Sequence, residues 1–232
     1  MIKAIAFDVD DTLLNTSEIL IPFAIQKIYQ VLLANGLKVT FEEFNRQRLS
    51  FVAQSSHREF FKHFIDGYPF TSEITVSRND LAATLIQHFY EPEIPLNANL
   101  IEGSSENLNR LKSKYKIYVV TSGVEKTQVQ KIEALKLIQW IPKENHLIID
   151  GNKYKTKKQA FQMILKKENL LPSELLSVGN RLSQEIRMAK ELGAKTCYFK
   201  FGEHANDIPK DHFEQADYTI THHKDFIPTC QL

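Results

Sequence analysis

The sequence FDVDDTLL, at residues 7–14, ends the first apolar run of the chain on a cluster of carboxylates. Asp8, Asp10 and Asp11 lie within four positions, and Thr12 follows them. The preceding segment, IKAIAF, is a short apolar run typical of a buried strand. Like charges this close together repel one another, so a cation is needed to offset them. The stretch therefore predicts a buried strand that delivers clustered carboxylates to its end.

Composition and charge are those of an ordinary globular protein. The chain has 232 residues, of which 43% are hydrophobic and 25% are charged, and its net charge is +1. This length allows one large domain, or a core with a smaller partner domain. The near-neutral charge lacks the basic footprint of a nucleic-acid-binding protein, so we expect no nucleic-acid partner.

Cysteine content and hydropathy indicate the compartment. Cys197 and Cys230 are far apart and cannot form a disulfide scaffold, so a reducing compartment is the simpler expectation. The first apolar run meets Asp8 too soon for a signal peptide. No window of about 18 apolar residues is evident, so no membrane span is expected. These features predict a cytoplasmic protein.

Between residues 17 and 93 the apolar spacing predicts helices and no convincing strand. Apolar residues recur at helical spacing over 17–35, and the segment TFEE at 40–43 is a capping box that begins a further helix. Another helix is predicted over 77–90. The proline-containing segment EPEIPLNANL that follows is typical of a connector.

After about residue 97 the pattern changes to apolar runs that alternate with helical segments. Strands that alternate with helices predict a parallel sheet covered on both faces. The first strand belongs with this second half, so the helical stretch is an insertion. The predicted fold class is α/β, with a Rossmann-like parallel-sheet core over 1–16 and 94–232 and an all-helical cap domain inserted at 17–93. The apolar runs are 116–123, 146–150, 175–180, 195–199 and 217–221.

Polar residues end the predicted strands, at the edge of a parallel sheet where ligands bind. The second strand ends in Thr121, Ser122 and Gly123, and the fourth ends in a glycine and Asn180. A hydroxyl and backbone N–H groups at such an edge can hold phosphate oxygens. We expect Thr121 to do so, and the further candidates for binding phosphate are Thr12, Ser122, Gly123 and Lys157.

A divalent cation accounts for the carboxylate cluster. Magnesium prefers oxygen ligands, usually one or two carboxylates with waters and substrate phosphate. Asp8 and Asp10, joined by Asn180 and Glu185 from another strand end, form a candidate magnesium site. Lys155, in the loop before a helix, would balance the charge of the carboxylate and of the phosphate.

Four motifs in this order resemble those of the haloacid dehalogenase-like superfamily of phosphatases. They are DVDDT, VVTSG, a lysine before a helix, and VGNRLSQEI. Together they cover the α/β core, about two thirds of the chain. The inserted helical segment matches only in its position and helical character. One such motif is a moderate signal, and four in the family's order are a strong one.

The resemblance implies a role for each matching residue. Asp8 would be the nucleophile that attacks phosphorus and forms an aspartyl-phosphate. Asp10 would protonate the leaving oxygen and then activate water, and its backbone carbonyl would bind magnesium. Thr121 would hydrogen-bond the transferring phosphoryl group, and Lys155 would stabilise the charge of the nucleophile and the phosphate.

The magnesium ligands depart from the family pattern. The resemblance implies that Asn180 and Glu185 anchor magnesium, directly or through water. The family commonly has Gly-Asp and then Asp five residues later, so a charge is lost at Asn180, while Glu185 keeps one on a longer side chain. We expect activity with a higher magnesium requirement. Asp11, where the family usually has glycine, is a milder change.

Two lysines compete for the same role. Lys155 lies six residues before Phe161, which is the family's usual spacing of lysine to phenylalanine. It also precedes Thr156, the expected cap of the helix, which would point the lysine towards the strand ends. We therefore prefer Lys155, with Lys157 as the second choice.

Polar residues of the inserted segment allow two interpretations. Arg46, Arg48, His57 and Arg58 could read a substrate, but such residues more often form a solvated helix face, and we favour the second interpretation. The aromatic residues of the segment are interpreted as its core.

The leading functional hypothesis is a magnesium-dependent phosphatase that hydrolyses a small phosphate monoester. A helical cap implies a closed pocket and a metabolite-sized substrate, by family analogy. A haloacid dehalogenase is disfavoured, because its pattern lacks the second carboxylate, Asp10. A sugar-phosphate mutase stays open, and so does a non-catalytic protein that binds a phosphorylated ligand. Nucleotides, sugar phosphates and flavin mononucleotide all remain candidate substrates, and the oligomeric state is not predicted.

Overall fold

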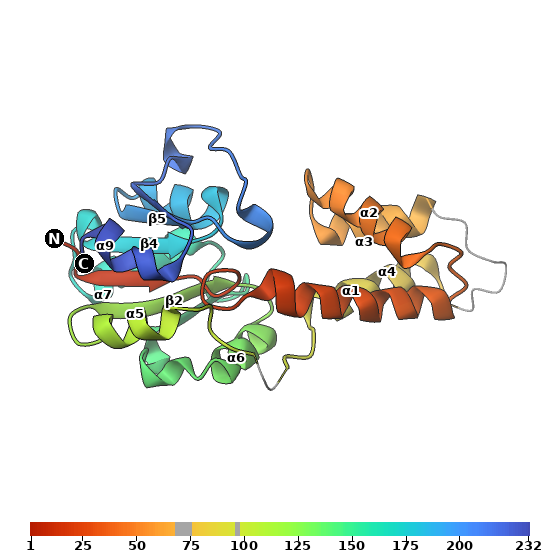
Figure 1. Cartoon of the computed structure of the whole chain (residues 1–232), viewed down its shortest axis with the longest axis horizontal. Helices are drawn as coiled ribbons and strands as arrows, with labels where there is room; N and C mark the ends of the chain where they lie inside the picture. The colour runs from red at the N-terminus through yellow and green to blue at the C-terminus, as the bar shows by residue number, and fades with distance from the viewer. Residues whose placement is uncertain (68–75, 96–97) are drawn as a thin grey trace. The chain divides into compact units, whose positions relative to one another are not determined.

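The computed structural model describes residues 1–67, 76–95 and 98–232. These residues form two compact units (Figure 1). One unit comprises Met1–Glu18 and Ile94–Leu232, and the other comprises Ile19–Glu93. The first unit contains the β-sheet, and the described part of the second is helical.

A parallel sheet of six strands forms the centre of the first unit. Its strands are β1 Ala4–Phe7, β2 Lys116–Ser122, β3 His146–Ile149, β4 Leu175–Gly179, β5 Lys195–Phe199 and β6 Tyr218–Ile220. The order is β3-β2-β1-β4-β5-β6, so β1 lies inside the sheet with β2 and β4 as neighbours. Phe7, the last residue of β1, lies beside Val119 and Val178. The predicted α/β fold with a parallel sheet is confirmed.

Helices cover both faces of this sheet. They are α5 Ser104–Leu111, α6 Glu125–Ala134, α7 Lys157–Lys167, α8 Arg187–Lys190 and α9 Phe226–Cys230. Phe161 of α7 and Ala189 of α8 share a core cluster with Ala6 of β1. The next residue, Phe7, points to the opposite face, where its ring centroid lies 5.5 Å from that of Phe226 in α9. Figure 1 shows α5 and α9 together on this second face.

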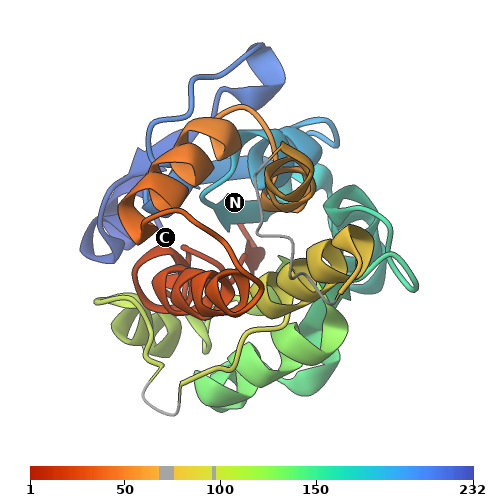
Figure 2. The same ribbon diagram turned by 90° about the vertical axis from the view of Figure 1, so that its right-hand side faces the viewer.

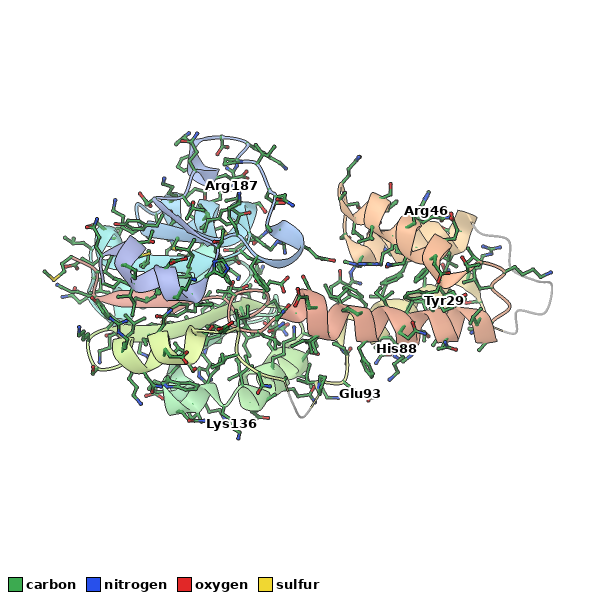
Figure 3. All side chains as sticks on the ribbon, viewed as in Figure 1. Tyr29, Arg46, His88, Glu93, Lys136 and Arg187 are labelled. Atoms are coloured by element: carbon green, nitrogen blue, oxygen red, sulfur yellow. The ribbon has the colours of Figure 1, made fainter. Side chains whose placement is uncertain are left out.

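Four described helices surround the apolar core of the second unit (Figure 2). They are α1 Thr16–Ala34, α2 Phe41–Val52, α3 His57–Gly67 and α4 Arg78–Tyr90. The core is rich in aromatic rings, including Phe44 and Phe61, as expected for this segment. Tyr29, labelled in Figure 3, packs against it and donates its hydroxyl hydrogen to the carbonyl of Val39 at 2.7 Å.

The helix starts predicted in this unit are confirmed by their caps. Thr40 Oγ1 accepts a hydrogen bond from the backbone N–H of Glu43 at 3.2 Å, at the start of α2. Ser77 Oγ accepts from the backbone N–H of Asp80 at 3.1 Å, at the start of α4. Each cap satisfies a backbone donor that the helix itself leaves unpaired.

Two residues that we expected on a solvated face are buried. Arg48 and His57 pack into the helical unit, with Arg48 Nη1 2.7 Å from His57 Nε2 and the His57 ring stacked on that of Phe89. Arginine only donates, so His57 accepts at Nε2. Burial, followed by the positive charge of Arg48, lowers the pKa of His57 to about 3. Arg46 and Arg58 are exposed, as expected.

Among the described residues, α1 is long and apolar enough to cross a membrane by length and composition, with a mean hydropathy of 1.2. This corrects the expectation that the chain has no such window. Its residues Leu20, Ile25, Ile28 and Leu32 are buried within the protein. The core helix of a globular protein has the same properties, so α1 gives no specific indication of a membrane span.

Candidate active site

The site begins where β1 ends, at the carboxyl edge of the sheet. The backbone N–H of Asp8 donates to the carbonyl of Val178 at 3.0 Å, which extends the pairing of β1 with β4 by one residue. Asp11 then adopts the left-handed conformation, with φ of 52°. Glycine takes this conformation most easily, but aspartate tolerates it. The Asp11 carboxylate accepts hydrogen bonds from the backbone N–H and the hydroxyl of Ser17, and these contacts stabilise the turn.

A buried lysine joins two buried carboxylates. Lys157 Nζ lies 2.6 Å from Oδ1 of Asp8 and also contacts Oε1 of Glu185. All three side chains are at most 6% exposed. The structure therefore corrects our preference for Lys155: that residue is exposed, and Lys157 is the lysine that meets the carboxylates.

The start of α7 explains which lysine enters the site. Thr156 caps the helix and accepts from the backbone N–H of Gln159 at 3.3 Å, as predicted. The Gln159 side chain in turn accepts from the backbone N–H of Lys155 at 2.8 Å, which holds this residue in the loop before the helix. Lys157 is the first residue of the helix and carries its side chain to Asp8.

Glu185 and Asn180 follow the end of β4, as predicted. Glu185 lies in a π-helical turn, Leu182–Ile186, and its Oε2 accepts from the backbone N–H of Arg181 at 2.9 Å. The carboxylate packs directly over Gly179, where an added Cβ would lie 2.2 Å from Cγ of Glu185. Asn180 is buried, and its Nδ2 donates to the carbonyl of Phe201 at 3.3 Å.

Burial and charge shift the ionisation of this group. Burial raises the pKa of Asp8 to about 7, and the negative charges of Glu185 and Asp10 add to the effect, although Lys157 opposes it. For Lys157, burial favours the neutral amine, but the charges of Asp8 and Glu185 prevail and raise its pKa. The site thus holds a lysine that stays charged and a nucleophile candidate that a further cation would help to ionise.

Asp10 is held by residues that the sequence analysis did not identify. Its Oδ1 accepts from Lys131 Nζ at 2.6 Å and from the hydroxyl of Thr16 at 2.5 Å, and its Oδ2 accepts from Nε2 of Gln128 at 3.2 Å. Burial alone would raise the pKa of Asp10, but Lys131 and these hydrogen bonds lower it. The two α6 residues lie three positions apart, on one face of the helix.

The residues expected to bind phosphate are placed unequally. Thr121, at the end of β2, is fully buried and donates its hydroxyl hydrogen to Oε1 of Gln128 at 3.0 Å. Ser122 is exposed. The N–H of Gly123 already donates to the carbonyl of Ile149 at 3.1 Å. This contact corrects the expectation that the Gly123 N–H is available to phosphate.

Thr12 also differs from its expected place. Its side chain is fully buried, its hydroxyl finds no hydrogen-bond partner among the described residues, and its carbonyl accepts from Nε2 of His223 at 2.6 Å. These contacts place Thr12 in the packing of the loop, and its contact with phosphate stays a prediction.

The oxygen donors at this edge of the sheet fit magnesium in their chemistry. Asp8 and Glu185 offer carboxylate oxygens, Asn180 offers an amide oxygen, and the backbone of Asp10 offers a carbonyl. Magnesium typically takes one or two carboxylates and completes its shell with water and phosphate. Among residues 1–67, 76–95 and 98–232, no cluster of three or more His, Cys, Asp or Glu suited to a metal is found. The cation would therefore depend on amide, carbonyl and water oxygens beside two carboxylates.

Comparison with known families identifies the class of protein. Residues 2–193 match the family model of the haloacid dehalogenase-like hydrolases. The match spans most of the chain, so the chain belongs to the haloacid dehalogenase-like hydrolase family. The family expected from the four motifs is confirmed, and with it the expectation of a phosphatase-type hydrolase.

Two relatives bear a more specific name. The chain is 31% identical to the glyceraldehyde 3-phosphate phosphatase of Pyrococcus furiosus, over 95% of this chain and 89% of the relative. It is 28% identical to the protein of the same name from Methanocaldococcus jannaschii, over 95% of this chain and 93% of the relative.

Solved structures share the fold over the full chain. A predicted phosphoglycolate phosphatase from Haemophilus somnus superposes with a TM-score of 0.71, at 19% identity, over 99% of this chain and 98% of its own. The HAD hydrolase YfnB from Bacillus subtilis, solved with bound magnesium, superposes with a TM-score of 0.68, at 16% identity, over 100% and 99% of the two chains.

Proposed function

We propose that the chain is a magnesium-dependent phosphatase that hydrolyses a small phosphate monoester through an aspartyl-phosphate on Asp8. The observation that carries the proposal is the arrangement of two carboxylates at the end of β1, each with its own buried lysine. Asp8 contacts Lys157 at 2.6 Å, and Asp10 contacts Lys131 at 2.6 Å. One carboxylate is thus placed for attack and the other for proton transfer.

In the first step a carboxylate oxygen of Asp8 attacks phosphorus, and the bond from phosphorus to the substrate's ester oxygen breaks. The leaving oxygen takes a proton from Asp10 and departs as an alcohol. Asp10 must first bind this proton, although Lys131 lowers its pKa in the free site. Lys157 offsets negative charge at Asp8 and at the phosphoryl group, which is the role we first gave to Lys155. Thr121 lies at the same edge of the sheet and would orient a phosphoryl oxygen once its hydroxyl turns from Gln128 to the phosphate.

In the second step water attacks the phosphorus of the aspartyl-phosphate. Asp10, now ionised, takes a proton from this water, and the bond between phosphorus and Asp8 breaks. Inorganic phosphate leaves, and both aspartates return to their starting states. The same residue therefore acts as acid and then as base.

Magnesium would be held by Asp8, by the backbone carbonyl of Asp10, and by Asn180 and Glu185. When bound it supplies positive charge to the phosphoryl oxygens and favours the ionised form of Asp8. The amide at Asn180 supplies less negative charge than the aspartate common in the family, so we expect a high magnesium requirement.

For the substrate we propose a phosphorylated three-carbon sugar, with glyceraldehyde 3-phosphate as the first candidate. The names of the archaeal relatives support this choice. The division into a core of residues 1–16 and 94–232 and a helical cap of 17–93 belongs to the same proposal, and a cap of this kind favours small substrates. A cytoplasmic location is consistent with the free, buried thiols of Cys197 and Cys230.

Release of phosphate tests the proposal. p-Nitrophenyl phosphate and glyceraldehyde 3-phosphate are offered with and without millimolar magnesium to the wild type, to Asp8→Asn, and to Asp66→Asn as an exposed control. We expect magnesium-dependent release that Asp8→Asn abolishes and Asp66→Asn preserves. Folded wild-type protein that releases no phosphate from either ester would refute the proposal. Such a result would favour a mutase or a ligand-binding protein.

A further inference from the structure

We propose that Lys131 is a positioning residue for proton transfer, which fixes Oδ1 of Asp10 and leaves Oδ2 as the oxygen that exchanges the proton. This inference rests on the proposed function, because it assumes that Asp10 transfers protons to and from the substrate and water. It adds a role for helix α6, whose residues lie outside the four motifs matched in the sequence.

The two oxygens of Asp10 are bound unequally. Oδ1 accepts from Lys131 at 2.6 Å and from Thr16 at 2.5 Å, both short contacts. Oδ2 accepts from Gln128 at 3.2 Å, at the long end of a normal hydrogen bond. A carboxylate oxygen that carries two short hydrogen bonds from strong donors is poorly placed to give or take a proton. Oδ2 is therefore the available oxygen.

The burial of Lys131 indicates that its role is to bind Asp10 and not to keep the protein surface soluble. The Lys131 side chain is only 7% exposed, whereas that of Asp10 is 30% exposed. A lysine is rarely buried unless it is paired. The ammonium group thus approaches Asp10 from the protein side, and the partly exposed carboxylate keeps an open side for a reacting group.

Gln128 links Asp10 to the predicted phosphate-binding residue. The backbone carbonyl of Ser122 only accepts, so the Gln128 atom 3.2 Å from it is the amide nitrogen, and the same nitrogen lies 3.2 Å from Oδ2 of Asp10. The amide oxygen therefore faces Thr121, whose hydroxyl donates to it at 3.0 Å. This chain of hydrogen bonds sets the distance between the residue that moves protons and the residue that would hold the phosphoryl group.

The leaving group provides the test. p-Nitrophenol departs readily as an anion, but phenol needs a proton when it leaves, so only phenyl phosphate depends strongly on Asp10 as an acid. We would measure kcat and KM of the wild type, Lys131→Met and Lys131→Arg with both esters at saturating magnesium. The matched control is Lys158→Met, which removes a partly exposed lysine paired with Glu191 at 2.9 Å in the same unit.

We expect Lys131→Met to lose at least about ten-fold more kcat with phenyl phosphate than with p-nitrophenyl phosphate, as a misplaced general acid should. KM should change little, Lys131→Arg should restore part of the difference, and Lys158→Met should leave the ratio unchanged. Circular dichroism would check the fold of each variant. If Lys131→Met does not fold, Lys131→Gln carries the same test, because it also removes the ammonium group from Oδ1 of Asp10 while keeping a polar side chain.

Two results would overturn the inference in distinguishable ways. Equal loss with both esters, in a folded variant of an active enzyme, would refute the positioning role of Lys131 and leave the proposed function standing. Wild-type protein that hydrolyses neither ester nor glyceraldehyde 3-phosphate would refute both proposals together.

Discussion

Replacing Lys157 with methionine is the most direct test of the charge balance in the site. The substitution keeps most of the apolar side chain but removes the ammonium group that lies between Asp8 and Glu185. Two buried carboxylates would then face each other without the cation that now separates them. Their side chains are 6% and 2% exposed, so water cannot screen the repulsion.

The expected magnitude follows from this burial. Exposed ion pairs contribute about 0.2–1 kcal/mol, whereas removal of one partner from a buried pair costs about 3–5 kcal/mol. Lys157 belongs to the second class. With a urea m-value of about 2–3 kcal/mol/M for a chain of this size, such a loss would lower the midpoint of urea unfolding by about 1–2.5 M.

The assay is urea unfolding in the presence of a chelator, followed by tryptophan fluorescence and far-UV circular dichroism. Lys155→Met is the matched control, since Lys155 is exposed and its substitution should change the free energy of unfolding by less than about 0.5 kcal/mol. Phosphatase activity should be lost in Lys157→Met and kept in Lys155→Met. A fully active and stable Lys157→Met variant, or loss of activity in Lys155→Met instead, would refute the reasoning.

Three further predictions concern the metal ligands, the close packing and the pH dependence. Asn180→Asp should lower the magnesium concentration for half-maximal activity by about three- to ten-fold, because it restores a ligand charge; a magnesium titration that is unchanged would contradict this. Gly179→Ala should destabilise the fold and reduce activity, because the new Cβ would lie 2.2 Å from Cγ of Glu185, and thermal unfolding with activity assays would detect it. His57 has a pKa of about 3 when folded, below its unfolded value, so the unfolded state binds the extra proton between about pH 6.5 and 3, and stability falls as the pH falls through this range. Between pH 7 and 5 the protonation of His57 should lower the free energy of unfolding of the wild type by about 2 kcal/mol. This loss should be absent from His57→Gln, which keeps an acceptor for Arg48. Urea midpoints that shift equally in both proteins would contradict the prediction.

The sheet was predictable because each strand is short, apolar and bounded by polar residues. The run at 116–123 became β2 Lys116–Ser122, and the run at 195–199 became β5 with the same bounds. Such signals are local. Because the carboxyl ends of parallel strands meet at one edge of the sheet, they also place Asp8, Thr121 and Asn180 together at that edge. This part of the candidate site therefore follows from the sequence.

The lysines were harder to predict because the start of a helix decides where they point. Lys155 and Lys157 are two residues apart on either side of the Thr156 cap, and the hydrogen bond that the Lys155 N–H donates to the Gln159 side chain holds Lys155 in the loop. The cap at Thr156 was predicted correctly, but the position of a cap does not decide which neighbouring side chain turns towards the sheet. The six-residue spacing to Phe161 favours Lys155, but this residue is exposed, and the buried lysine is Lys157, two residues further on.

Lys131 and Gln128 could not be identified from the sequence. In the segment EKTQVQKIEA both residues look like the solvent-facing side of a helix, where lysine and glutamine are common. Only the packing of α6 against the sheet edge brings them to Asp10. Two features of the sequence could have pointed to them. Gln128 and Lys131 are three residues apart and so share a helix face, and the two carboxylates of Asp8 and Asp10 carry more negative charge than one lysine can balance.

The place of β1 within the sheet has a consequence for folding during synthesis on the ribosome. β1 cannot pair with β2 until Val119, the partner of Phe7, has been synthesised 112 residues later. At about 5–20 residues per second this delay is roughly 6–22 s. The core of the second unit, by contrast, draws its members from Ile21 to Phe89 and can collapse during that interval. Nascent chains are thus expected to carry an unpaired apolar strand, β1, followed by a helical segment that is already compact. The unpaired strand is the part of the nascent chain that we expect a chaperone to bind.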